Sequence, residues 1–152
     1  MKQLLLLLCL VFTVHVFSQQ IEEEKAKQVV VSFFDHFHAQ DSAAIKKLVS
    51  QDIILQRISK NKEGKVIVAT ESFDDLLKSI VSIPKTVSFQ EKLLSFSIQV
   101  DGAMANVWTP YEFYFKGELS HCGVNSFQLF KNENGEWKII YLVDTAKREG
   151  CQ

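Results

Sequence analysis

The sequence predicts an α+β fold in which three helices, all in the N-terminal half, pack on a curved, mostly antiparallel sheet of about six strands. Helical periodicity is confined to the first half of the chain. Strand-like runs follow one another near the end, at Ala103–Phe115, Ser120–Phe130 and Glu136–Asp144. The last two are joined by Asn132–Gly135, a polar turn ending in glycine, which predicts one long hairpin.

Residues 1–18 have the features of a signal peptide. Lys2 supplies a positive start, Leu4–Phe17 is largely apolar, and Val16-Phe17-Ser18 suits a cleavage site near Ser18. The apolar run is short for a membrane span and is soon followed by acidic residues. We therefore expect a periplasmic or secreted protein with no stable membrane anchor after cleavage.

Residues 19–152 remain, and this length suits a single domain with one core. The whole chain has a formal net charge of −1 at pH 7, and no segment concentrates lysine or arginine. A nucleic-acid partner is therefore not expected, because such binding needs a basic surface.

Three helices are indicated in the first half. Val30, Phe33, Phe34 and Phe37 form an apolar stripe that predicts a helix over Ile21–Ala39. Asp41 or Ser42 can cap a second, short helix that ends near Val49, and Ser72 can cap a third that ends near Val81. Acidic side chains at residues 22–24 suit the positive end of the first helix dipole.

Three further strands are expected before the C-terminal ones. They cover Ile53–Ile58, Val66–Thr70 and Thr86–Val100, with an exposed turn at Lys60–Lys65 between the first two. Pro110 cannot donate a ladder hydrogen bond, so we expect a bulge or an edge position there. A bulge would turn Trp108 or Tyr111 out of the regular alternation of the strand.

This order of elements resembles the nuclear-transport-factor-2-like superfamily of cone-shaped domains. The resemblance rests on a first helix ending in FHAQD, the TESFDDLLKSI helix, and the AMANVWTPYEFYF and GEWKIIYLVDT strands. The SHCGVNSFQLF segment and the last cysteine resemble small exported SnoaL-like or lumazine-binding proteins. The resemblance implies a pocket between helices and sheet, often in a homodimer, in a group that includes isomerases, dehydratases and binding modules.

Ketosteroid-isomerase-like members use a tyrosine on the first helix and an aspartate late in the first strand. The resemblance places Phe33 and Arg57 at these positions. Phenylalanine has no donor and arginine stays protonated, so that chemistry is not expected here. Arg57 could instead receive an anionic or carbonyl group, or it could be an exposed arginine beside the polar turn.

Strand alternation places polar and apolar residues together on one face of the predicted hairpin. His121 and Asn125 lie on the same side as Phe127 and Leu129, as expected of a pocket with few polar groups among apolar walls. Alternatively, the two polar residues satisfy backbone groups near a sheet edge. The predicted ligand-binding residues are Phe33, Phe37, Arg57, Trp108, Tyr111, His121, Asn125 and Phe127.

No metal site or cofactor is expected. His36 and His38 are two apart on a helix, so their rings point in different directions and cannot close on one ion. His38 is interpreted as a surface or capping histidine near the helix end. His121 and Cys122 point to opposite faces of a strand and cannot form a catalytic dyad.

Cys122 and Cys151 are candidates for a disulfide. An exported chain meets an oxidising compartment, where two thiols tend to pair. With the turn at residues 132–135, Cys122 should lie across from about residue 145, and the polar tail could bring Cys151 back to it. Two free thiols are the alternative.

Three functions are compatible with these residues. The favoured one is a non-catalytic domain that binds a small apolar or aromatic ligand. The second is a SnoaL-like hydrolase, dehydratase or isomerase with His121 as general base. No carboxylate that orients His121 is evident, although Asp144 or Glu112 could approach it from adjacent strands. The third is a homodimeric interaction module that uses the opposite sheet face, with Phe130, Ile140 and Leu142.

Overall fold

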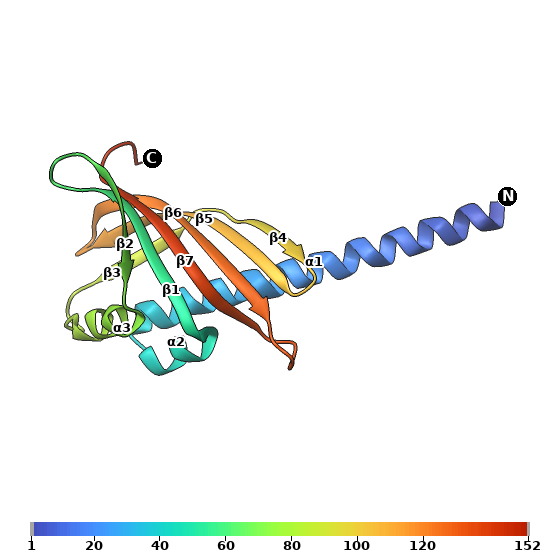
Figure 1. Cartoon of the computed structure of the whole chain (residues 1–152), viewed down its shortest axis with the longest axis horizontal. Helices are drawn as coiled ribbons and strands as arrows, with labels where there is room; N and C mark the ends of the chain where they lie inside the picture. The colour runs from blue at the N-terminus through green and yellow to red at the C-terminus, as the bar shows by residue number, and fades with distance from the viewer. Residues whose placement is uncertain (1, 152) are drawn as a thin grey trace.

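A computed structural model describes the backbone of residues 2–151 and the side chains of residues 19–151. Three helices pack against one curved sheet, which confirms the α+β class (Figure 1). The helices are α1 (Lys2–Ala39), α2 (Ser42–Leu48) and α3 (Phe73–Ser82). The strands are β1 (Val49–Lys60), β2 (Val66–Glu71), β3 (Phe89–Leu93), β4 (Ser97–Asp101), β5 (Met104–Phe115), β6 (Glu118–Lys131) and β7 (Trp137–Lys147).

The sheet has seven strands in the order β2-β1-β7-β6-β5-β3, and β4 also pairs with β5. Among the strand pairs of the described residues, β1–β7 is parallel and the others are antiparallel. The predicted long strand over 86–100 is two strands, β3 and β4, which accounts for the strand beyond the expected six. Their interruption faces Pro110, whose carbonyl accepts the Leu94 N–H at 2.9 Å. Since Pro110 has no N–H to return, the ladder breaks there.

Helix α1 begins well before the predicted start at Ile21, and no glycine or proline interrupts residues 2–39. The predicted signal peptide, residues 1–18, lies outside the residues whose side chains are described. Among the described residues, no helix is both long enough and apolar enough to cross a membrane.

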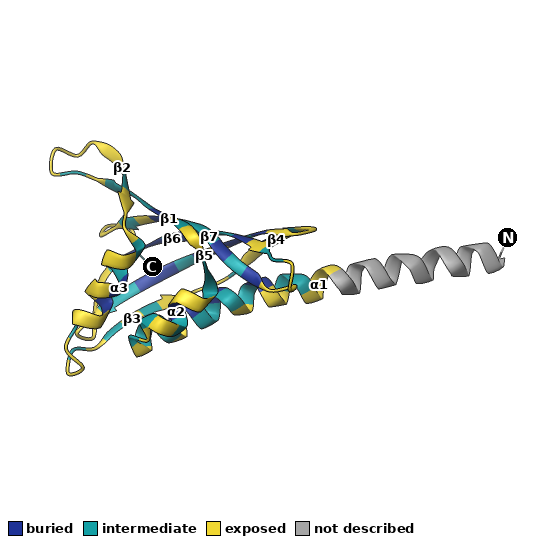
Figure 2. Cartoon of the chain, turned by 60° about the horizontal axis from the view of Figure 1, so that its bottom comes forward, coloured by how far each residue is buried: buried dark blue, intermediate teal, exposed yellow. Residues whose placement is uncertain are grey.

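The apolar stripe of α1 forms the core with the inner, concave face of the sheet (Figure 2). Val30, Phe33 and Phe34 are at most 5% exposed. The rings of Phe33 and Phe34 each meet the ring of Phe127 edge-on, with centroids 6.0 Å apart. Edge-to-face contacts of this kind add to the burial of apolar area, so α1 is held by packing more than by its own propensity.

Glu22 joins α1 to the β6–β7 hairpin. Its carboxylate accepts a hydrogen bond from the indole N–H of Trp137 at 3.1 Å and pairs with Lys131. The hydrogen bond from Lys131, followed by that from Lys25, lowers the pKa of Glu22 to about 2. The expected role of residues 22–24 at the helix dipole is wrong, because α1 begins at Lys2 and these residues lie far inside the helix. Glu22 instead bonds to the sheet.

Both predicted helix caps are present. Asp41 accepts a hydrogen bond from the Ala44 N–H at 2.9 Å, and Ser72 accepts one from the Asp75 N–H at 3.3 Å. These bonds satisfy amide groups that have no partner within the first turn of α2 and α3.

The β6–β7 hairpin turns at residues 132–135 as predicted, but a bulge between Gln128 and Leu129 changes its register. Cys122 lies opposite Lys147, two residues beyond the expected position near residue 145, and the bulge accounts for one of those two residues. Leu142 lies opposite Phe127 on the inner face, so its expected place on the outer face is wrong.

Candidate functional site

A row of polar residues crosses the inner face of the sheet. Arg57 of β1, Asp144 of β7, Asn125 of β6 and Thr109 of β5 are direct neighbours in the strand register. Thr109, Asn125 and Asp144 are no more than 8% exposed. Directly opposite residues on neighbouring strands share a face, so these polar groups sit beside the apolar core.

Arg57 and Asp144 form a close ion pair. The Arg57 Nε–H lies 3.0 Å from both carboxylate oxygens of Asp144, and Nη2 lies 2.9 Å from Oδ2. Burial opposes the charge of the guanidinium, but the hydrogen bond to Asp144 raises the pKa of Arg57. Arg57 therefore neutralises a buried carboxylate and is not simply an exposed residue beside the Lys60–Lys65 turn.

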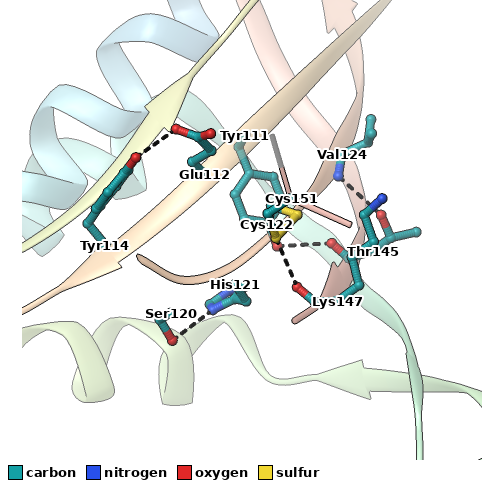
Figure 3. Close-up of a disulfide and its surroundings, with 10 residues drawn as sticks. All are labelled: Tyr111, Glu112, Tyr114, Ser120, His121, Cys122, Val124, Thr145, Lys147 and Cys151. Carbon is teal, nitrogen blue, oxygen red and sulfur yellow. Dashed lines mark hydrogen bonds between the residues drawn. A yellow bond between two sulfur atoms is a disulfide. The ribbon is translucent and has the colours of Figure 1, made fainter. Parts of the chain in front are cut away.

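Tyr111 of β5, two residues beyond Thr109, contacts the same carboxylate. Its hydroxyl lies 3.2 Å from Asp144 Oδ2 and 2.9 Å from the Thr145 carbonyl oxygen. Figure 3 shows the contact with Thr145. Burial, together with the nearby negative charge of Asp144, raises the pKa of the phenol. Tyr111 is thus a neutral hydrogen-bond donor to Asp144, in addition to Arg57.

Gly123 makes this arrangement possible. A Cβ atom at Gly123 would lie 1.7 Å from the Thr145 carbonyl oxygen and 3.0 Å from the ring of Tyr111. The position requires glycine because backbone and ring approach too closely for any side chain.

Glu91 of β3 adds a second carboxylate. Its Oε1 accepts a hydrogen bond from Asn125 Nδ2 at 2.7 Å. Burial, which outweighs this bond, raises the pKa of Glu91 to about 7, and the charge of Asp144 acts in the same direction. Near neutral pH, Glu91 can therefore either donate or accept a proton.

The second oxygen of Glu91 is open. No hydrogen bond between described residues involves Oε2, whereas no fully buried polar side-chain atom of these residues lacks a partner. Oε2 is therefore not fully buried. Glu91 as a whole is only partly buried.

His38 supports Glu91 from α1. Its Nε2 accepts the backbone N–H of Glu91 at 2.9 Å, which requires a neutral ring. Burial lowers the pKa of His38, although the charge of Asp35 opposes this. The expected surface or capping role for His38 is wrong, because the tertiary structure places β3 against this side of α1.

His121 is half-buried at the edge of the cluster. Its ring stacks on Phe113 with centroids 4.9 Å apart, and its Nδ1 lies 3.2 Å from the hydroxyl of Ser120. Burial, followed by the charge of Arg57, lowers the pKa of His121. No hydrogen bond between described residues joins this ring to the expected orienting carboxylates, Asp144 or Glu112.

The apolar candidates divide into three groups. Phe33 and Phe127 are at most 2% exposed and pack on each other, so they belong to the core. Phe37 is only partly buried and meets Phe89 edge-on, close to His38. Trp108 keeps the regular alternation of β5 and is 48% exposed on the outer face, so its expected place in the pocket is wrong.

Cys122 and Cys151 form a disulfide with Cα atoms 5.7 Å apart. Figure 3 shows the bridge beside Tyr111 and His121. The bridge fastens the segment after β7 to β6, close to the Thr145 carbonyl that accepts the Tyr111 hydroxyl.

Among the side chains of residues 19–151, no group of three or more histidine, cysteine or carboxylate residues could hold a metal ion. Within the polar cluster, Arg57 is paired with Asp144 and neutralises negative charge that a cation would need.

Glu91 was missed by the sequence analysis, although the pattern contained a signal for it. Strand alternation puts Glu91 on the same face as Phe89 and Leu93. An acidic residue between two inward apolar ones is unusual, and it could have been identified as a candidate buried carboxylate.

No family model matches this chain, and no curated protein matches it. Solved structures do. An NTF2-like protein of unknown function from Shewanella baltica OS155 aligns over 84% of this chain and 95% of its own, with a TM-score of 0.63 and 15% identity.

Two further structures are similar. One is a protein of unknown function from Mycobacterium tuberculosis, with a TM-score of 0.67 and 17% identity over 89% of this chain and 77% of that chain. The other is a ketosteroid isomerase-like protein from Erwinia carotovora atroseptica SCRI1043, with a TM-score of 0.58 and 18% identity over 84% of this chain and 97% of that chain.

The fold is therefore that of cone-shaped α+β domains. It is the NTF2-like fold, which confirms the resemblance read from the sequence. At these identities the likeness extends to the fold alone.

Proposed function

We propose that this protein binds a small, largely apolar or aromatic molecule against the inner face of the sheet, and that the molecule carries one polar group. The supporting observation is a buried, hydrogen-bonded polar cluster in which one carboxylate oxygen, Glu91 Oε2, has no hydrogen-bond partner among the described residues. Few polar groups among apolar walls are typical of small-molecule sites. The pocket itself stays a prediction.

Glu91 would recognise the polar group of the ligand. When protonated it donates to a carbonyl or ether oxygen, and when ionised it accepts from a hydroxyl or amine. Asn125 orients the carboxyl group through its hydrogen bond, and Arg57 with Tyr111 keeps the neighbouring Asp144 neutralised. Phe37 supplies apolar surface nearby.

The test is mass spectrometry of small molecules extracted from protein purified from its native host. We expect one compound to be enriched with the unsubstituted protein and lost with Asn125→Leu and Glu91→Ala. Trp108→Ala is the matched control, because Trp108 lies on the outer face, and it should retain the compound. Equal recovery from all four proteins would contradict binding at the polar cluster.

A second candidate function, a hydrolase, dehydratase or isomerase, is favoured by one observation. Burial raises the pKa of Glu91 to about 7, which suits proton transfer at neutral pH. Glu91 replaces His121 as the candidate base here, since no carboxylate orients the His121 ring among the described contacts. Loss of turnover in Glu91→Gln with ligand binding retained would support catalysis over binding alone.

Export is proposed on two grounds. Residues 1–18 have the pattern of a signal peptide, and the Cys122–Cys151 disulfide suits an oxidising compartment. Cell fractionation followed by intact mass should find a protein in the periplasm or medium that begins near Gln19. A full-length, cytoplasmic protein would contradict this proposal.

A further inference from the structure

Strand β2 is an open edge of the sheet. It is the first strand in the sheet order, and β1 is the strand that it pairs with. Five of its six residues are exposed, including Val66 at 61%, Ile67 at 38% and Val68 at 60%. Figure 2 shows the β1–β2 hairpin extending away from the rest of the domain.

This edge lacks the usual protection against pairing. Its residues, VIVATE, have high β-propensity, and no proline or charged residue interrupts Val66–Thr70. No register shift occurs in its pairing with β1. An exposed, regular, apolar edge is a template for another strand.

The turn determines which backbone groups face outward. The Asn61 N–H donates to the Lys65 carbonyl at 2.9 Å, so Lys65 directs its backbone toward β1. Backbone direction alternates along a strand, so Ile67, Ala69 and Glu71 do the same. Val66, Val68 and Thr70 therefore present their backbone N–H and carbonyl groups outward.

We propose that β2 pairs antiparallel with β2 of a second copy of this chain, with the two-fold axis at Val68. In this register Val68 meets its own counterpart and Val66 meets Thr70, and each pair exchanges hydrogen bonds through outward-facing groups. Lys65 then lies opposite Glu71 at both ends of the paired strands.

Charge complementarity is what identifies a second copy as the partner. The strand has a positive residue before it and a negative residue at its end. Two copies that pair antiparallel therefore place opposite charges beside each other at both ends. The surface along one strand is smaller than the ~1,000 Å² expected of a stable interface, so the dimer should be concentration-dependent.

The first test is sedimentation velocity on protein purified from cells that express the full chain, over a wide concentration range. Val68→Lys should stay monomeric, because it places two ammonium groups at the two-fold axis. Val81→Lys on α3 is the matched control, since Val81 is an exposed valine (53%) that lies outside β2, and it should dimerise like the unsubstituted protein. Equal sedimentation of both variants would overturn the proposal.

The second test addresses the register. Lys65→Glu alone and Glu71→Lys alone should each weaken the dimer, whereas the double exchange should restore it. Val68→Cys should form a covalent dimer on a non-reducing gel, because directly opposite Cα atoms lie about 5.5 Å apart, within reach of a disulfide. Absence of both rescue and cross-link would overturn the pairing at Val68. A monomer at every concentration would overturn self-pairing altogether.

Discussion

Glu91 makes the stability of this protein depend on pH. Its pKa rises from the usual 4.5 to about 7 on folding, so the folded chain favours the protonated form. The contribution of this group is full below pH 4.5 and is lost as pH rises toward 7.

Glu91→Gln should remove the loss of stability at high pH, because glutamine does not ionise. We expect the variant to exceed the unsubstituted protein in free energy of unfolding at pH 8 by an upper limit of about 3 kcal/mol, and to equal it near pH 4. Urea denaturation at both pH values measures the difference. Glu118→Gln, at an exposed residue of β6, is the control and should show no such pattern.

Gly123 should tolerate no side chain. Gly123→Ala would place Cβ 1.7 Å from the Thr145 carbonyl oxygen, so β6 and β7 must move apart. We expect a loss of about 3 kcal/mol in thermal or urea denaturation, because the neighbouring atom is backbone and cannot rotate away. Gly102→Ala is a partial control, since nothing lies within 4 Å of its Cβ position, although its φ of +58° adds some strain. Equal losses at the two positions would contradict the steric explanation.

At the scale of elements, the parallel pairing of β1 with β7 brings Arg57 beside Asp144. This pair is the one parallel contact in the sheet, and it joins residues 87 apart in the sequence. The ion pair thus connects β1 of the β1–β2 hairpin with β7, the last strand.

Arg57→Met should cost about 2 kcal/mol in urea denaturation, because the buried carboxyl group of Asp144 would lose its ion-pair partner. The value is modest because the Arg57 side chain is 41% exposed. The double variant Arg57→Met with Asp144→Asn should cost less than the sum of the two single changes. Additive costs would show that the pair contributes no coupling energy.

At the scale of the whole molecule, the Cys122–Cys151 bridge holds the C-terminus on the sheet. It closes a segment with a sequence separation of 29 residues. Replacing both cysteines with serine should lower the free energy of unfolding by about 3 kcal/mol, because the bridge restricts the unfolded chain. Reductant should destabilise the unsubstituted protein and leave the double variant unchanged. An intact mass without the 2 Da loss of a disulfide would contradict the bridge.

The register at the end of the chain shows where sequence reasoning stops. The β6–β7 hairpin and its turn follow from the Asn132–Gly135 segment, and the two faces of β6 follow from alternation, whereas the face of Leu142 in β7 does not. The bulge at Gln128 and the break between β3 and β4 depend on how neighbouring strands curve together, and no local pattern shows this. Trp108 was misplaced for the same reason, since the irregularity at Pro110 is in its partner strands and not in β5.

The sequence by itself determined the α+β class, the apolar face of α1, the helix caps and the inward side of β6, because periodicity and capping are local properties. Only the tertiary structure brought Glu91 to Asn125 and Arg57 to Asp144. Those contacts depend on strand order and register, which bring together residues far apart in the chain. Strand order and register therefore determine which polar groups are buried in the same place.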